Sequence, residues 1–132
     1  MSVNGQSYYQ TLCVPTTNLD RFVIVSVFQS APSTTTTPDA TAFITSGDGQ
    51  LVGAQIGLVV VMAAQASHTT VTAPTSYTFT APSGTTTHYV CDLTASHTYT
   101  LAGANQGTAT ASAGGVLTFT TTGSGSKTVT IS

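Results

Sequence analysis

The last third of the chain carries four Thr-x-Thr triplets at an even spacing of ten residues, and this spacing is typical of a β-rich fold. Side chains alternate between the two faces of a strand, so each triplet places two threonines on one face and its middle residue on the other. The spacing predicts strands of about six residues joined by turns as an antiparallel meander. The triplets begin at Thr98, Thr108, Thr118 and Thr128, and two more begin at Thr70 and Thr78.

The rest of the chain also predicts strands and turns, with no helical period of useful length. A hairpin is expected from Ala42–Thr45 and Gln50–Ile56 around the turn Ser46–Gly49. About ten strands in 132 residues predict a single domain, residues 1–132, with an all-β fold: a two-sheet antiparallel β-sandwich, immunoglobulin- or fibronectin-like in character. The other expected strands are Ser7–Val14, Arg21–Gln29, Leu58–Ala64, Thr69–Ala73, Ser76–Ala81, Thr85–Leu93, Thr98–Ala102, Gly107–Ala111, Val116–Thr121 and Thr128–Ser132.

The segment Leu58–Ala64, with the sequence LVVVMAA, is apolar without alternation. Such a strand either lies fully covered in the middle of a sandwich, or has a second face that another domain or subunit covers. Both alternatives follow from the pattern.

Residues 30–40 form a Ser/Thr/Pro-rich stretch that predicts a loop. Threonines in such stretches are candidate O-glycosylation sites. The candidates here are Thr34, Thr35, Thr36 and Thr37.

Charged residues make up only 5% of the chain, against roughly 25% in a typical soluble domain. The formal charge of -2 leaves no basic patch, which argues against a nucleic-acid partner and against anionic membranes. The longest apolar stretch, Leu51 to Ala64, is too short to span a bilayer, so membrane insertion is not expected either. With 29 Thr and 14 Ser, the polar groups of the chain are mainly hydroxyls and not charges. Such a surface suits an extracellular or cell-surface module or an assembling subunit. The two cysteines, Cys13 and Cys91, permit one disulfide; the alternative is two buried free thiols.

The segment from Asp92 to Leu101 resembles the tyrosine corner of immunoglobulin-like and fibronectin type III sandwiches. The resemblance implies that Leu93 and Tyr99 are structural residues. The Tyr99 hydroxyl would bond backbone near the preceding turn, although Ala95 stands where those domains often carry Pro.

A wider succession of motifs runs from Asp20 to the C-terminus: FVIVSVFQ, SGDGQLVGAQIG, HYVCDLTASHTYTL, TATASAGGVLTFTT and TVTIS. It resembles the C-terminal β-sandwich domain of heparinase II/III-type polysaccharide lyases. In that family the catalytic residues belong to other domains. The resemblance therefore implies a β-domain that packs against a partner or helps to hold polysaccharide, and it transfers no catalytic residue.

Candidate chemical sites are sparse. His88, Asp92 and His97 could form a two-His-one-Asp metal site, but isolated residues of these types near turns are more often solvated, so no metal or cofactor is predicted. The chain has no Glu, no G-x-S-x-G elbow and no HExxH, so no catalytic residue is predicted either. Candidate stacking platforms for sugar rings are Tyr8, Tyr9, Tyr77 and Tyr89.

Two functional hypotheses follow. The first is a non-catalytic extracellular structural or assembly protein that forms a homo-oligomer or filament, such as a subunit of a surface layer, sheath, fibre or adhesin. Its terminal strands, Ser7–Val14 or Thr128–Ser132, could pair with another subunit. The second is an accessory carbohydrate-associated module of a lyase-like enzyme, packed against a neighbouring domain.

Overall fold

The computed structural model of the protein describes residues 2–3, 6–12, 25–32, 34, 37–65 and 71–132; side chains are described from residue 25 onward, except at 30–32. These residues form strands and turns, and none of them is helical. The strands are β1 (Ser2–Val3), β2 (Gln6–Leu12), β3 (Ser26–Pro32), β4 (Thr41–Thr45), β5 (Leu51–Ile56), β6 (Val59–Ala64), β7 (Thr75–Ala81), β8 (Thr85–Val90), β9 (Thr98–Gly103), β10 (Gly107–Thr110), β11 (Leu117–Thr122) and β12 (Gly125–Ile131).

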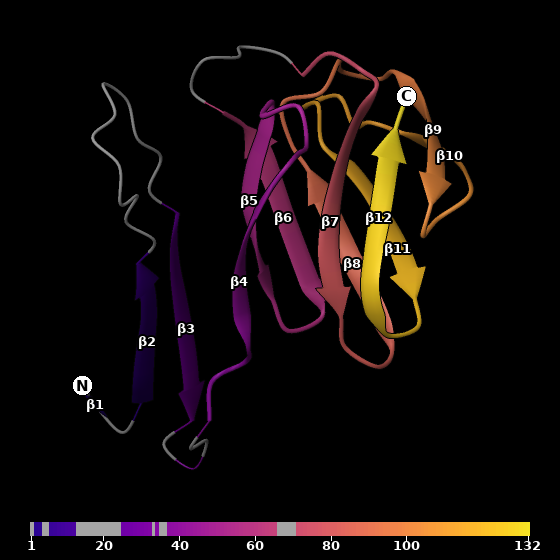
Figure 1. The fold of residues 1–132 in the computed structure, drawn as a ribbon. Coiled ribbons are helices and arrows are strands. Elements are labelled where there is room, and N and C mark those ends of the chain that lie inside the picture. Colours follow the sequence, from indigo (N-terminus) through magenta and orange to yellow (C-terminus); the bar gives the residue numbers. More distant parts are fainter. Residues whose placement is uncertain (1, 4–5, 13–24, 33, 35–36, 66–70) are drawn as a thin grey trace.

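Two sheets pack face to face as a sandwich (Figure 1). The four-stranded sheet has the order β10-β9-β12-β7, and the five-stranded sheet has the order β11-β8-β6-β5-β4. Every pair within them is antiparallel except β6 and β8, which run parallel. The predicted all-β sandwich is therefore confirmed. A third sheet, β1-β2-β3, stands apart from the sandwich on the side of β4 and β5 (Figure 1).

The core lies between the two sheets and is filled by the inward positions of alternating strands. In β7, for example, Tyr77 and Phe79 are buried while Thr78 and Thr80 are exposed. The middle residues of the triplets behave in the same way: Tyr99, Phe119 and Val129 point inward. The alternation predicted from Thr-x-Thr is therefore present in the fold.

The expected C-terminal meander is wrong. β9 and β10 do form a hairpin, but the next strand, β11, crosses to the five-stranded sheet. β12 then returns to the four-stranded sheet and lies between β9 and β7. A period of ten fixes strand length plus turn length, but it does not distinguish a turn within one sheet from a turn between sheets.

Thr128–Ser132, expected as a strand that could pair with another subunit, is paired on both sides within the chain. β12 pairs with β7 from Gly125 to Ile131 and with β9 from Val129 to Ile131, so both of its edges are engaged. The other terminal candidate, Ser7–Val14, corresponds to β2. This strand lies between β1 and β3.

The hairpin predicted around Ser46–Gly49 is confirmed as β4 and β5. Its turn is organised by Asp48, whose carboxylate accepts hydrogen bonds from Ser46 Oγ at 2.6 Å, Gln50 Nε2 at 2.8 Å and Thr75 Oγ1 at 3.1 Å. Partial burial raises the pKa of Asp48, but these hydrogen bonds outweigh it and lower the pKa to about 2. Gly49 adopts the left-handed conformation, φ 72°, which glycine tolerates best.

Other boundaries differ from the sequence-based expectation. β3 begins at Ser26, and residues 21–24 lie outside the described part of the chain. It extends to Pro32, so the predicted loop 30–40 starts later than expected. Residues 71–73 of the expected strand Thr69–Ala73 form no strand, and Thr69 and Thr70 lie outside the described residues.

Candidate functional site: an apolar sheet face

The outer face of the five-stranded sheet carries a row of apolar side chains set by strand register. Phe43 of β4 pairs with Ala54 of β5, Ala54 with Val61 of β6, Val61 with Tyr89 of β8, and Tyr89 with Thr118 of β11. Because paired residues point to the same side of a sheet, these side chains lie on one face. We call the outward residues of β4, β5, β6 and β8 that are apolar or aromatic the apolar face: Phe43, Val52, Ala54, Ile56, Val59, Val61, Ala63 and Tyr89.

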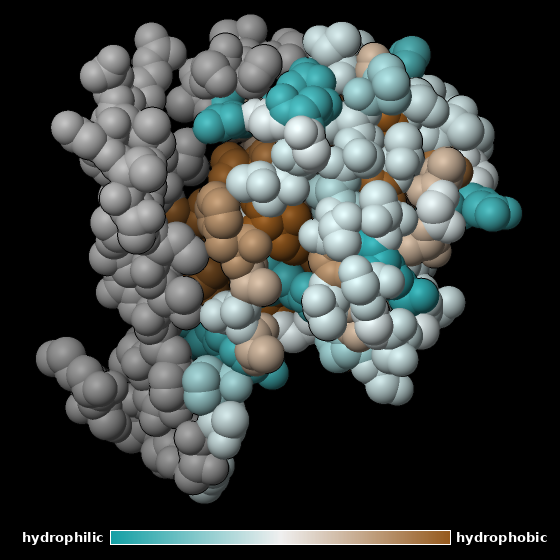
Figure 2. All heavy atoms as spheres, viewed as in Figure 1, coloured by the Kyte–Doolittle hydropathy of each residue, from teal (hydrophilic) through white to brown (hydrophobic). Residues whose placement is uncertain are grey.

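Half of the apolar face is open to solvent. Phe43 is 43% exposed, Val59 36%, Val61 39% and Tyr89 39%. None of the eight residues is charged. Figure 2 shows brown, apolar residues gathered on the side of the molecule next to the N-terminal part, while most of the remaining visible surface is pale or teal.

The centre of the apolar face is covered. Val52 and Ala54 of β5 are buried although they point outward, and neither belongs to the core between the sheets. Val27 of β3 is buried as well and is also not part of that core, whereas its neighbours Ser26 and Phe28 are exposed. One side of β3 is therefore packed. The hairpin of β2 and β3 stands on the side of β4 and β5 (Figure 1).

The apolar run Leu58–Ala64 includes β6, and the two sides of this strand differ in exposure. Val60 and Met62 are fully buried in the core, while Val59 and Val61 remain more than one-third exposed on the other side. Full coverage of both sides, one of the two alternatives from sequence, does not hold within the single chain.

The outer face of the four-stranded sheet has the opposite chemistry. We call its hydroxyl-bearing positions on β7, β9, β10 and β12 the threonine face: Thr78, Thr80, Thr98, Thr100, Thr108, Thr110, Thr128 and Thr130. Its hydroxyls bond one another across strands. Thr78 Oγ1 lies 2.8 Å from Thr128 Oγ1, and Thr98 Oγ1 lies 2.9 Å from Thr110 Oγ1. Four of the eight hydroxyls are therefore paired within the face.

A side-chain amide binds one backbone carbonyl on each of two edge strands of the sandwich, β7 and β11. Gln55, itself buried, donates from Nε2 to the Thr80 carbonyl on β7 at 2.7 Å. Asn105 donates from Nδ2 to the Thr120 carbonyl on β11 at 2.7 Å. These carbonyls are the groups that a strand from another chain would use, so the amides oppose pairing at those edges.

A groove of about 710 Å³ lies at one end of the sandwich, between residues 39–42 and 55–59 on one side and residues 80–83 on the other. Asp39 is the one ionisable residue among those that line it, and none of them is aromatic. The groove therefore has no stacking platform for a sugar ring.

A polar cluster is buried between the sheets, directly behind Tyr89. His88 Nδ1 lies 2.9 Å from the Tyr77 hydroxyl, and its Nε2 lies 3.0 Å from Thr121 Oγ1. The imidazole also stacks on Phe119, with ring centroids 4.7 Å apart. Burial lowers the pKa of His88 to about 4 and raises the pKa of Tyr77. His88 is thus a neutral core residue whose two nitrogens are both engaged.

The predicted structural residues have clear roles where they are described. Leu93 and Tyr99 are buried, and the Tyr99 hydroxyl accepts a hydrogen bond of 2.9 Å from the backbone N–H of Thr94. This bond ties β9 to the turn that precedes it. Cys91 is a free, partly buried thiol, and burial together with the neighbouring Asp92 raises its pKa. Cys13 lies outside the described residues.

The predicted sugar-contact tyrosines do not form one surface. Tyr77 is 1% exposed, so the contact expected there is corrected: its ring belongs to the core, because position 77 faces inward in β7. Tyr89 lies on the apolar face. Tyr8 and Tyr9 lie in β2, and their side chains are outside the described part.

The four candidate glycosylation threonines are only partly described. Thr34 and Thr37 are exposed, and Thr35 and Thr36 lie outside the described residues.

His88, Asp92 and His97 do not come together. His88 is in the core, Asp92 accepts a hydrogen bond from the Ala64 N–H, and His97 packs its ring edge against Tyr99. In the described part of the chain, no three His, Cys, Asp or Glu residues are grouped as a metal site would need. Nor does that part contain a helix of the length and apolarity that crossing a membrane requires.

The apolar face was only partly foreseen from sequence. The run LVVVMAA predicted a second apolar surface on β6, but Phe43 and Tyr89 join it only through the register of β4 and β8. No protein-family model and no curated protein matches the chain. The argument for function therefore rests on the chemistry of the surface.

Proposed function

We propose that the protein is a non-catalytic, extracellular β-sandwich subunit that assembles with copies of itself, as in a surface layer, sheath, fibre or adhesin. The observation that carries this proposal is the apolar face, whose exposed residues are uncharged and lie side by side on β6 and β8. Contiguous apolar surface of this kind marks an interaction site in a soluble protein.

The weak charge of the chain supports the same proposal. With a formal charge of -2, copies of the protein repel one another little, so an apolar contact has little electrostatic cost to overcome. The side-chain amides of Gln55 and Asn105 bind the carbonyls of Thr80 and Thr120 and oppose strand pairing there. Face contact is therefore the mode of assembly that the surface favours.

The test is the oligomeric state of the purified protein over a wide concentration range, by light scattering and negative-stain electron microscopy. We expect ordered, concentration-dependent assemblies. A monodisperse monomer at the highest concentration reached would overturn the proposal.

A second candidate is an accessory module that binds polysaccharide beside a catalytic domain. One observation favours it: Tyr89 offers a 39% exposed phenol on a sheet face, flanked by Val61 and Thr118. A glycan array tests this function. Binding that is lost in Tyr89→Ala but kept in Tyr99→Phe, which alters the buried tyrosine instead, would support it.

A further inference from the structure

β10 is an edge strand of the four-stranded sheet, and no described strand pairs with its outer edge. On its inner side lies β9, where Thr100 stands opposite Thr108. The Thr100 N–H donates to the Ser132 carbonyl at 2.7 Å, and the Thr100 carbonyl accepts from the Ser132 N–H at 3.0 Å, so both groups of Thr100 point away from β10. In an antiparallel pair, residues opposite each other either exchange their backbone hydrogen bonds or both turn away. The N–H and C=O of Thr108, and of Thr110 two residues later, therefore point out of the sheet at its edge.

The other edge strands of the sandwich, β4, β7 and β11, each have a side-chain amide at or near the edge. Amides bind carbonyls of β7 and β11, as described above. Just before β4, Gln29 Nε2 donates to the Asp39 carbonyl at 3.0 Å, and Gln29 Oε1 accepts from the Asp39 N–H at 2.9 Å. Among the described residues, no side-chain amide binds the backbone of β10, and its sequence GTAT has no charge and no proline. β10 thus lacks the charges, prolines and covering groups that commonly protect an edge strand.

A second copy of β10 is complementary to this edge. When two β10 strands run antiparallel about a two-fold axis at Ala109, Thr108 of each copy lies opposite Thr110 of the other. Both residues present an N–H and a C=O at the edge, so each such pair exchanges two backbone hydrogen bonds, as in a regular antiparallel ladder. This register uses all of the outward backbone groups of β10.

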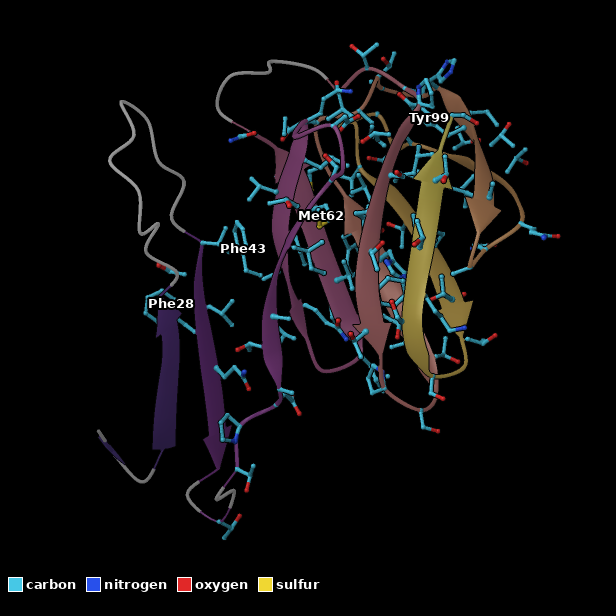
Figure 3. The ribbon with its side chains drawn as sticks, in the orientation of Figure 1. Phe28, Phe43, Met62 and Tyr99 are labelled. Carbon is cyan, nitrogen blue, oxygen red and sulfur yellow. The ribbon has the colours of Figure 1, made fainter. Side chains whose placement is uncertain are left out.

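The side chains on both faces of β10 suit the same register. Ala109, which lies at the axis, pairs with Tyr99 of β9 (Figure 3), and both side chains point toward the core. Its methyl group leaves room for the methyl group of the second copy. On the other face, Thr108 and Thr110 continue the threonine face, whose members form cross-strand hydroxyl pairs at 2.8 and 2.9 Å within the chain. No charge opposes the approach of the two strands.

From this edge we infer that two copies of the chain join through β10, so that their four-stranded sheets become one continuous sheet. The inference rests on the self-assembly proposed above for its partner, and it adds a contact that does not use the apolar face. β10 belongs to the other sheet and lies on the side of the sandwich away from β2 and β3 (Figure 1). A copy paired through β10 therefore keeps its apolar face free, and the two contacts together extend an assembly beyond a dimer.

The first test is made in the full-length chain with Val61→Asp, which places a charge on the apolar face and leaves association through β10 to be measured alone. We expect a dimer and nothing larger in sedimentation velocity. Adding Thr110→Pro should weaken this dimer by about tenfold or more, because proline removes one backbone hydrogen bond from each Thr108–Thr110 pair. Proline is tolerated where the N–H of an edge strand faces solvent, so the variant should fold, which circular dichroism checks. Thr110→Val is the matched control: it loses the same hydroxyl but keeps the N–H, and should dimerise like its parent.

A cysteine at the axis gives a second measurement that does not depend on proline. Ala109→Cys brings together one thiol from each copy at a non-hydrogen-bonded pair, where the Cα atoms lie about 4.5 Å apart, within the range of a disulfide. Mild oxidation should give a covalent dimer on a non-reducing gel. Thr80→Cys, exposed on the edge strand β7, is the control, and it should cross-link no more than the unaltered chain with its own cysteines.

The outcomes separate the inference from the proposed function. A monomeric Val61→Asp chain that also fails to cross-link through Ala109→Cys would overturn the inference, while large assemblies of the unaltered chain would still support the proposed function. A dimer that Thr110→Pro leaves intact would overturn the inference as well. If the unaltered chain stops at a dimer that Thr110→Pro dissociates, the inference holds and assembly through the apolar face fails.

Discussion

The two outer faces of the sandwich differ in their β-branched residues: the four-stranded sheet carries eight threonines, and the apolar face of the five-stranded sheet includes the valines Val52, Val59 and Val61. Threonine on the four-stranded sheet carries a hydroxyl where valine on the five-stranded sheet carries a methyl group. Thr78 and Thr128 bond each other across strands at 2.8 Å, whereas Val59 and Val61 leave their methyl groups in water. The low charge of the chain is therefore not the reason for the apolar face, because the same low charge coexists with a threonine-rich face on the other sheet.

The difference between the two faces shows that apolar side chains are exposed on the outer face of the five-stranded sheet without being needed there for strand formation. β-Branched residues suit both faces equally as strand formers, so strand formation did not require valine at positions 59 and 61. Threonine there would serve the fold. The proposed self-assembly gives the apolar residues of β6 and β8 a role in contact outside the single sandwich, and the predictions below test that proposal.

The largest expected effect is a difference in the loss of stability between substitutions on the two sides of β6. Met62→Ala removes a fully buried side chain and should lower the free energy of unfolding by about 2 to 5 kcal/mol. Val61→Ala, one residue away on the open side, should lower it by less than about 1 kcal/mol. Urea denaturation of both variants measures the difference. Equal losses would mean that the open side of β6 is as well packed as the core.

The next effect concerns His88, the inward neighbour of Tyr89. The native state keeps His88 neutral with a pKa of about 4, while the unfolded chain takes up a proton near 6.5. Since the native pKa is the lower one, stability is complete above pH 6.5 and falls as the pH drops from 6.5 to 4. The loss should be about 3 kcal/mol.

Unfolding free energies between pH 7 and pH 4 check this, with His88→Gln as the control. Glutamine can still donate and accept hydrogen bonds but does not titrate, so its stability should be flat over that range. Asp48 gives a second pH range in which stability changes. Its native pKa of about 2 lies below the ordinary value of 3.8, so the stability that it contributes is kept down to pH 3.8 and is lost between pH 3.8 and 2. A slope between pH 6.5 and 4 that survives in His88→Gln would remove His88 as its cause.

Alternation carried the correct parts of the prediction from sequence. It identified the strands and the inward residues Tyr99, Phe119 and Val129, because side-chain direction is a local property of a strand. It did not identify which sheet holds each strand, nor the parallel pairing of β6 with β8, because these depend on contacts between distant segments.

The candidate site shows the same limit. Tyr77 was predicted at the surface, but position 77 faces His88 across the core. The inward direction of Tyr77 could be derived from its position between Ser76 and Thr78, whereas its hydrogen bond to His88 required the fold. The exposure of Phe28 and Phe43 carried no sequence signal, because single apolar residues in strands are usually core.

A smaller effect distinguishes two threonines of the buried polar cluster. Thr86 Oγ1 is buried and has no hydrogen-bond partner among the described residues, so Thr86→Val should raise the free energy of unfolding by up to about 1 kcal/mol. Thr121→Val leaves His88 Nε2 without its partner and should lower it by about 1 to 2 kcal/mol. We expect thermal or urea denaturation to show changes of opposite sign in the free energy of unfolding of the two variants. Two losses of equal size would show that the Thr86 hydroxyl is satisfied.

The smallest effect on stability tests the comparison of the outer faces directly. The double variant Thr78→Val/Thr128→Val replaces an exposed hydroxyl pair with the side chain that β6 carries. Both residues are β-branched and the pair is exposed, so stability should change by less than about 1 kcal/mol. Association measured by sedimentation should become stronger and less specific, because each copy now has a second apolar patch. If association is unchanged, exposed valine alone does not drive assembly, and the contact would depend on the aromatic residue of that face, Tyr89.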